Sequence, residues 1–131
     1  MISFRLFLYT LLLVSITGCN QMKPQEGFTN VKPKLFNDLI VNNVQLIDVR
    51  TPEEYIENHI PNAININYFS DDFIADITKL DTTKPIYIYC RSGKRSKKSV
   101  IPFKEVGFTQ IYNLEGGILN WTSKGLSTQS K

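Results

Sequence analysis

One segment of the chain restricts the possible folds more than any other. Ile86–Tyr89 is a run of aromatic and β-branched residues, which is typical of a buried strand. Cys90 follows at once, and a short loop containing Gly93 leads into a helical pattern that begins near Ser96. A strand that runs through a tight loop into a helix is one βα unit, so the segment favours an α/β fold.

Apolar runs and helical patterns alternate along the rest of the chain in the same way. We expect strands at residues 28–31, 45–49, 63–66, 86–89 and 110–112. We expect helices at residues 34–41, from 51 onwards, at 70–78 (capped by Ser70), at 96–106, and a short final helix that carries Trp121. This alternation predicts one small domain with a roughly five-stranded parallel sheet and helices on both faces.

Local signals mark the ends of several of these helices. Pro33 suits the first turn of the first helix, and Thr51–Glu54 reads as a capping box with proline at the first helical position. Gly107 should end the helix that follows the cysteine. Pro102 lies inside that helix, where proline removes a hydrogen bond, so we expect a kink near Lys98 or an early end to the helix.

The position of Cys90 indicates a nucleophile. At the carboxyl end of a strand and facing a helix N-terminus, backbone N–H groups and the helix dipole favour negative charge. The thiolate is the reactive form of cysteine, and such surroundings favour it. Gly93 lets the loop take a positive φ and close tightly. The alternative is a structural cysteine at the end of a core strand, since cysteine is often buried.

Positive charge is concentrated around this loop. Between Lys84 and Lys104 there are seven lysines and arginines and no acidic residue, whereas the whole chain carries a net charge of only +3. A small anionic substrate would be attracted there. We assign it to Arg91, Lys94 and Arg95, and interpret the lysines that follow as a solvated helix face. No basic stripe interleaved with aromatic residues accompanies them, so a nucleic-acid partner is not expected.

Three motifs together resemble the single-domain rhodaneses, which are proteins of the thiosulfate sulfurtransferase type. The first comprises residues 46–55 and 59–63, the second is the cysteine loop, and the third comprises residues 115–121. They follow one another in the family's order between Thr29 and Gly125. Asn58 and Asn62 stand where the family usually has glycine, and asparagine tolerates the left-handed conformation better than most residues.

The resemblance implies a chemistry and a set of roles. The Cys90 thiolate would take sulfane sulfur from a thiosulfate-like donor as a persulfide and pass it to a thiol or another thiophilic acceptor, with no metal or organic cofactor. The family also implies that His59 belongs to a structural turn. Independently of the resemblance, Asp48 and Arg50 lie at the end of the second strand, where we expect them to form a buried ion-pair and hydrogen-bond network with Glu54 that supports the loop. The substrate-binding residues would be those of the loop: Arg91, Ser92, Gly93, Lys94, Arg95 (contacting the anionic part of the donor) and Ser96.

Two other functional classes remain open at this point. Cysteine-dependent phosphatases and arsenate reductases also use a cysteine loop for anions, but they place arginine six residues after the cysteine. Here that position is Ser96 and the arginine is Arg95. A noncatalytic module that binds a partner or carries persulfide sulfur is the second alternative, and the presence of Cys90 disfavours the purely noncatalytic form.

The N-terminus predicts the cellular compartment. Met1–Arg5 carries one positive charge, and Leu6–Thr17 is an apolar run of 12 residues. A spanning helix needs about 20 apolar residues, so the run fits a secretory signal instead. The sequence that closes it, Ile16–Cys19, resembles a bacterial lipobox, which implies cleavage before Cys19 and lipid attachment to its thiol. Asn20 would favour the outer membrane in a Gram-negative cell.

The chain therefore divides into four parts. Residues 1–18 are the expected lipoprotein signal peptide, 19–27 the lipidated cysteine and a polar tether, 28–127 the rhodanese-like domain, and 128–131 a polar tail. With Cys19 acylated, Cys90 is the only thiol of the mature chain and no internal disulfide can form. We expect a monomer that is exported across the inner membrane and lipid-anchored in the cell envelope.

Overall fold

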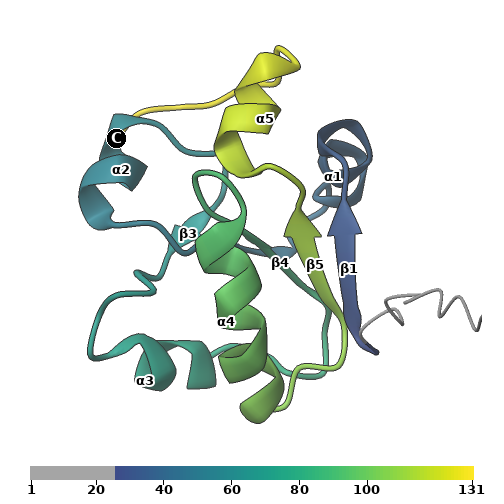
Figure 1. The fold of residues 1–131 in the computed structure, drawn as a ribbon, viewed down its shortest axis with the longest axis vertical. Helices are drawn as coiled ribbons and strands as arrows, with labels where there is room; N and C mark the ends of the chain where they lie inside the picture. The colour runs from purple at the N-terminus through teal and green to yellow at the C-terminus, as the bar shows by residue number, and fades with distance from the viewer. Residues whose placement is uncertain (1–25) are drawn as a thin grey trace, which may run out of the picture.

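The computed structural model describes residues 26–131. The expected signal peptide, Cys19 and most of the expected tether lie outside the described residues. Strands and helices alternate along the described chain (Figure 1). The elements are β1 (Phe28–Val31), α1 (Pro33–Leu39), β2 (Gln45–Asp48), α2 (Pro52–Glu57), β3 (Ile64–Asn65), α3 (Phe73–Thr78), β4 (Ile86–Tyr89), α4 (Lys94–Glu105), β5 (Ile111–Leu114) and α5 (Gly117–Ser123).

All five strands belong to one parallel sheet, in the order β1-β5-β4-β2-β3. The predicted α/β class with a five-stranded parallel sheet is confirmed. β4 lies in the middle, and each of its four residues is buried because the sheet is covered on both sides. Cys90 therefore emerges at the centre of the carboxyl edge, where open α/β sheets place their functional groups.

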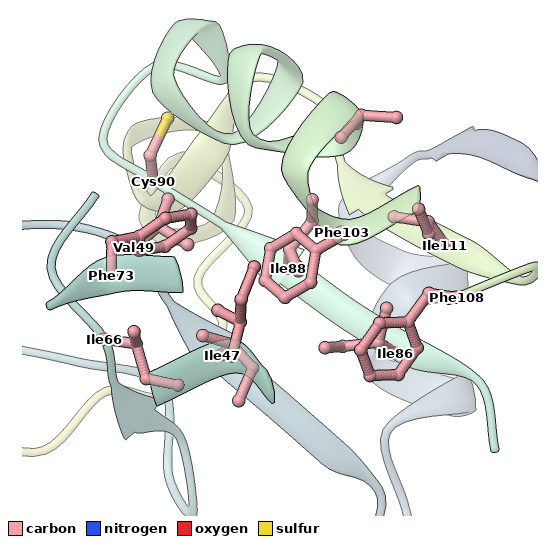
Figure 2. Close-up of a cluster of buried hydrophobic side chains, with 12 residues drawn as sticks. Ile47, Val49, Ile66, Phe73, Ile86, Ile88, Cys90, Phe103, Phe108 and Ile111 are labelled. Carbon is pink, nitrogen blue, oxygen red and sulfur yellow. The ribbon is translucent and has the colours of Figure 1, made fainter. Parts of the chain in front are cut away.

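The two faces of the sheet carry separate cores. One core lies under α3 and α4 and includes Ile47, Ile88, Cys90 and Phe103 (Figure 2). The other lies between the sheet and the helices α1 and α5, with Trp121 fully buried in it. Successive residues of β4 point alternately into these two cores, which is why its apolar run is unbroken. Phe103 and Trp121 are both buried core residues, one in each core.

Some predicted element ends differ from those observed. β3 is shorter than expected, with two residues, and β5 runs on to Leu114. α3 begins at Phe73, because the Ser70 hydroxyl accepts the Asp72 N–H and holds a turn there without capping the helix. Asn62 adopts the expected left-handed conformation with φ of 67°, whereas Asn58 is extended.

The helix after the cysteine differs most from expectation. α4 begins at Lys94, two residues earlier than predicted, and continues to Glu105 through Pro102. The predicted early end is therefore wrong. Proline removes only the hydrogen bond to the carbonyl of Lys98, and Lys98 is exposed, so water can satisfy that carbonyl. Gly107 follows the helix with φ of 116°, as expected of a terminating glycine.

Both ends of the described chain are bound to the domain. At one end, the Gly27 carbonyl accepts a hydrogen bond from Ile111 N–H. At the other, Gln129 forms a two-bond backbone bridge with His59. Between residues 26 and 131, none of the helices combines the length and the apolar character that crossing a membrane requires.

Candidate active site

Cys90 is buried at the start of the short loop that connects β4 to α4. Its side chain is 1% exposed, and its Sγ accepts a hydrogen bond of 3.0 Å from the Gly93 N–H. Gly93 reaches this position with φ of 97°, which a side chain would oppose. The positive φ expected of Gly93 is confirmed. Figure 2 shows Cys90 Sγ pointing from the end of β4 toward the beginning of α4.

The first turn of α4 provides a second donor to the sulfur. Ser96 Oγ lies 3.4 Å from Cys90 Sγ and 3.2 Å from the Gly93 carbonyl oxygen, so its single proton can serve either acceptor. Ser96 is fully buried, and the Ser99 hydroxyl one turn later donates to the Ser96 carbonyl. The sulfur thus faces one backbone amide and one hydroxyl, and the hydroxyl can turn its proton either to the sulfur or to the Gly93 carbonyl.

The loop is held from the other side by α5. The Cys90 carbonyl accepts from Ile118 N–H at 2.9 Å, and the Arg91 carbonyl accepts from Leu119 N–H at 3.2 Å. Gly117 passes so close that a Cβ there would stand 2.4 Å from the Arg91 carbonyl oxygen. Only glycine allows this approach. The third motif of the sequence therefore acts as the support of the cysteine loop.

Arg95 does not extend freely into solvent. Its two terminal nitrogens donate to the two carboxylate oxygens of Glu54 at 2.8 and 2.9 Å, and its guanidinium lies 5.5 Å from the centre of the Phe69 ring. The bond to Arg95 holds the pKa of the Glu54 carboxyl below its ordinary value, and the bond to Glu54 raises the pKa of Arg95. The pair ties α4 to α2.

This pairing corrects one grouping that we expected from the sequence. Glu54 bonds to Arg95 and not to Arg50. Its carboxylate also accepts from the Thr51 N–H while the Thr51 hydroxyl accepts from the Glu54 N–H, so the predicted capping box is confirmed. One carboxylate therefore both starts α2 and anchors the end of the cysteine loop.

Asp48 and Arg50 form a separate, closed network after β2. Arg50 donates to both Asp48 oxygens, at 2.7 to 3.1 Å, and to the Asn58 carbonyl. Both charges are almost completely buried. Burial lowers the pKa of Arg50, but the bond to Asp48 and its charge outweigh this effect, so the pKa is raised overall. The ring of Tyr89 covers the guanidinium at 5.7 Å, and burial raises the pKa of the Tyr89 hydroxyl.

The remaining residues predicted to bind substrate lie on the outside of the loop. Arg91, Ser92 and Lys94 are exposed, and within residues 26–131 the Arg91 and Lys94 side chains take part in no ion pair. Their charges are therefore available to an anion. His59 is buried elsewhere: it stacks on Tyr55, its Nδ1 lies 2.8 Å from the Tyr55 carbonyl oxygen, and its Nε2 faces Gln129.

The model of the Rhodanese-like domain matches residues 32–124, most of the chain.

The chain belongs to the rhodanese-like domain family.

Curated relatives agree with this assignment. Thiosulfate sulfurtransferase 16 of Arabidopsis thaliana, a chloroplast protein, is 30% identical over 112 residues, which cover 78% of this chain and 93% of the relative. The thiosulfate sulfurtransferase GlpE of Pseudomonas paraeruginosa is 32% identical over 99 residues, covering 75% and 87%. Among solved structures, a rhodanese-like domain protein of Staphylococcus aureus superposes with a TM-score of 0.63 at 31% identity, covering 79% of this chain and 98% of that one.

Three contributors to the site of this rhodanese-like domain were not assigned a role from the sequence. They are the amide of Ile118, the missing side chain of Gly117 and the ring of Phe69. The Gly116–Gly117 pair is visible in the sequence, and two adjacent glycines indicate a turn in which backbones can approach closely. Both glycines adopt a positive φ in the structure. Nothing in the local sequence signals that Phe69 lies over Arg95, because that contact depends on the path of the loop before α3.

Proposed function

We propose that this rhodanese-like domain is a sulfurtransferase that moves sulfane sulfur from a thiosulfate-like donor to a thiophilic acceptor through a persulfide on Cys90. The observation that carries the proposal is the hydrogen bond from the Gly93 amide to Cys90 Sγ, at the head of α4 and within a basic loop. A sulfur anion is stabilised by such donors. The relatives named as thiosulfate sulfurtransferases support the choice of donor.

The first step is a nucleophilic displacement. The Cys90 thiolate attacks the outer sulfur of thiosulfate, a bond forms between the two sulfur atoms, and the bond to the sulfonate sulfur breaks. Sulfite leaves with the electron pair, and Cys90 carries a persulfide. Lys94 and Arg91 are exposed and without ion pairs in the described part of the chain, so they offer charge to the dianionic donor and to the leaving sulfite.

The second step regenerates the enzyme. An acceptor nucleophile attacks the outer sulfur of the persulfide, the bond within the persulfide breaks, and the electron pair returns to Cys90. Thiolate chemistry of this kind follows the rules of thiol–disulfide exchange. The negative charge on Cys90 faces the same donors before and after transfer, namely the Gly93 amide and the Ser96 hydroxyl. The two steps need no metal or organic cofactor.

The charge pattern of α4 supports anion binding at this end. Its first turn carries Lys94 and Arg95 and no acidic residue, although the positive end of a helix dipole disfavours cations there. Glu54 neutralises Arg95, so the uncompensated cation is Lys94. Such a placement costs stability unless an anion occupies the site. A dianionic donor is suited to this position.

Mass spectrometry of the protein after incubation with thiosulfate tests the proposal. A mass gain of one sulfur atom on Cys90, reversed by cyanide with release of thiocyanate, is the expected result. A Cys90→Ser variant provides the control. An unmodified Cys90, with no thiocyanate formed, would contradict the proposal. A stable persulfide that cyanide does not remove would instead favour a carrier that delivers its sulfur only to a partner protein. One relative, the putative sulfur carrier protein YrkF of Bacillus subtilis, has this role in its name.

We also propose that the protein is exported and lipid-anchored in the bacterial envelope through Cys19, facing the periplasm in a Gram-negative cell. The support is sequence alone: a short apolar run closed by Gly18 and Cys19. Cys19→Ser should abolish lipid modification and move the protein from the membrane fraction to the soluble envelope fraction. Unchanged partitioning would indicate a different attachment. The domain itself is expected to act as a monomer.

A further inference from the structure

A small pocket lies beside the cysteine loop. Its volume is about 190 Å³, and its walls come from α2, the beginning of the loop and α5. Figure 1 shows the loop before α4 between α2 and α5. Given about 30 Å³ for each water molecule in the liquid, this volume equals that of about six waters. The pocket is therefore large enough to hold a single amino acid.

The beginning of the cysteine loop borders this pocket through Arg91, the residue after Cys90, and the far end is linked to the pocket only through Glu54. Ile118 and Leu119 line it and donate their backbone N–H groups to the carbonyls of Cys90 and Arg91. Glu54 also lines it and holds Arg95, at the far end of the loop. A molecule in the pocket would therefore be next to the loop that carries the persulfide, although Cys90 itself does not line the pocket.

The lining contains two arginines and two glutamates, but they are not equivalent. Arg50 is neutralised by Asp48, and Glu54 is neutralised by Arg95. The other two, Arg91 and Glu57, are exposed and make no ion pair or side-chain hydrogen bond within residues 26–131. The pocket thus has one positive and one negative charge available to a ligand, and these suit a zwitterion better than a simple anion.

We propose that this pocket binds the sulfur acceptor, and that the acceptor is a small zwitterionic thiol of the amino-acid class, with its carboxylate toward Arg91 and its ammonium toward Glu57. The inference rests on the proposed function and names its second substrate. The acceptor thiolate attacks the outer sulfur of the Cys90 persulfide, a new sulfur–sulfur bond forms on the acceptor, and the electron pair of the broken bond returns to Cys90. No oxidant or reductant is consumed.

Four small thiols separate the two charges. Cysteine carries both groups, cysteamine only the ammonium, 3-mercaptopropionate only the carboxylate, and 2-mercaptoethanol neither. Single-turnover transfer from preformed Cys90 persulfide measures the acceptor step alone, so effects on the donor step are excluded. Rates are compared at equal thiolate concentration, because the thiolate is the attacking species. Cysteine and 2-mercaptoethanol thiolates have the same net charge, so the long-range field of the protein affects both alike.

Two variants then test the two contacts. Glu57→Gln should lower the ratio of the cysteine rate to the 2-mercaptoethanol rate by about threefold, the size expected of one partly exposed charge contact, and should also slow cysteamine. Arg91→Gln should lower the same ratio and slow 3-mercaptopropionate. Glu53→Gln on the same helix and Lys97→Gln on α4 are the controls, since neither side chain lines the pocket. The intrinsic reactivity of each thiol cancels when a variant is compared with wild type.

The outcomes separate this inference from the function on which it rests. Ratios that fall in Glu57→Gln and Arg91→Gln, and stay constant in the controls, support the zwitterion site. If the wild-type persulfide reacts with cyanide but the ratio is unchanged in both variants, or changes equally in the controls, the zwitterion site is wrong and the sulfurtransferase stands. If no persulfide forms with thiosulfate, both proposals fall.

Discussion

The neighbouring strands β2 and β4 both end in polar or reactive side chains, but the two ends differ in whether those side chains are available to a ligand. Asp48 pairs with Tyr89 in the sheet register, so the two strand ends lie side by side. After β2, the charges of Asp48 and Arg50 are buried and neutralise each other. After β4, the Cys90 sulfur accepts hydrogen bonds from the Gly93 amide and the Ser96 hydroxyl, and the loop around it carries exposed cations.

The difference is why we propose a structural role for the Asp48–Arg50 pair, which we call the clamp, and a reactive role for Cys90. A buried ion pair whose two charges neutralise each other offers a ligand no net charge. An amide and a hydroxyl that face a single sulfur can stabilise a thiolate, a persulfide or a developing charge in turn. The clamp also supports the site, because the Tyr89 ring covers Arg50 one residue before Cys90.

The strongest test of this contrast removes the sulfur. Cys90→Ser should abolish sulfur transfer from thiosulfate to cyanide, because a hydroxyl cannot hold sulfane sulfur as a persulfide. The fold should survive, since serine fills nearly the same volume and can bond to the same donors. Steady-state kinetics and circular dichroism check the two parts. Substantial turnover in a correctly folded variant would remove Cys90 from the mechanism.

Breaking the Asp48–Arg50 pair should instead lower the stability of the fold. Asp48→Asn leaves the Arg50 charge buried without a counter-ion, which commonly costs about 3 to 5 kcal/mol. Urea unfolding at neutral pH measures the change in the free energy of unfolding. The double variant Asp48→Asn with Arg50→Met should lose less than Asp48→Asn alone, because no charge is then stranded. A loss below about 1 kcal/mol for the single variant would contradict the clamp.

The fold was largely accessible from the sequence because its signals are local. Continuous apolar runs such as Ile86–Tyr89 identify strands buried on both sides, and Thr51–Glu54 identifies a helix start. Element ends were less certain, as α4 shows. Its start at Lys94 follows the left-handed Gly93, and it continues through Pro102 where the residue that loses its hydrogen-bond partner, Lys98, is exposed.

The candidate site was accessible in part. The position of Cys90, the role of Gly93 and the exposed charges of Arg91 and Lys94 follow from a single contiguous segment. The partner of Arg95 lies 41 positions earlier in the chain, and local sequence cannot choose between Glu54 and a substrate anion for it. Contacts of this kind depend on the packing of α2 against α4.

Arg95 combines features of the two strand ends, because it is paired with a carboxylate, as Arg50 is, and lies at the end of the cysteine loop. We expect Arg95→Ala to lower kcat/KM for thiosulfate at least about tenfold, or about 1.4 kcal/mol. It would remove both a cation near the donor and the link from the loop to α2. Lys97→Ala and Lys98→Ala, both exposed on α4, should cost only a fewfold, and high salt should abolish their effect. Equal, salt-sensitive losses at all three positions would indicate a diffuse field only.

The smallest expected effect concerns the Glu54 carboxylate and its dependence on pH. Because the bond to Arg95 holds the pKa of Glu54 below its ordinary value of 4.5, the pair stabilises the fold above that pH, and the stabilisation is lost as pH falls through the lowered value. Glu54→Gln should therefore cost about 1 kcal/mol at pH 7 in urea unfolding, and the difference from wild type should shrink below about pH 4. Glu53→Gln, an exposed neighbour in α2, is the matched control. A difference that is constant from pH 7 to pH 3 would mean that the charge pair contributes nothing and that only the hydrogen bonds of the capping box were changed.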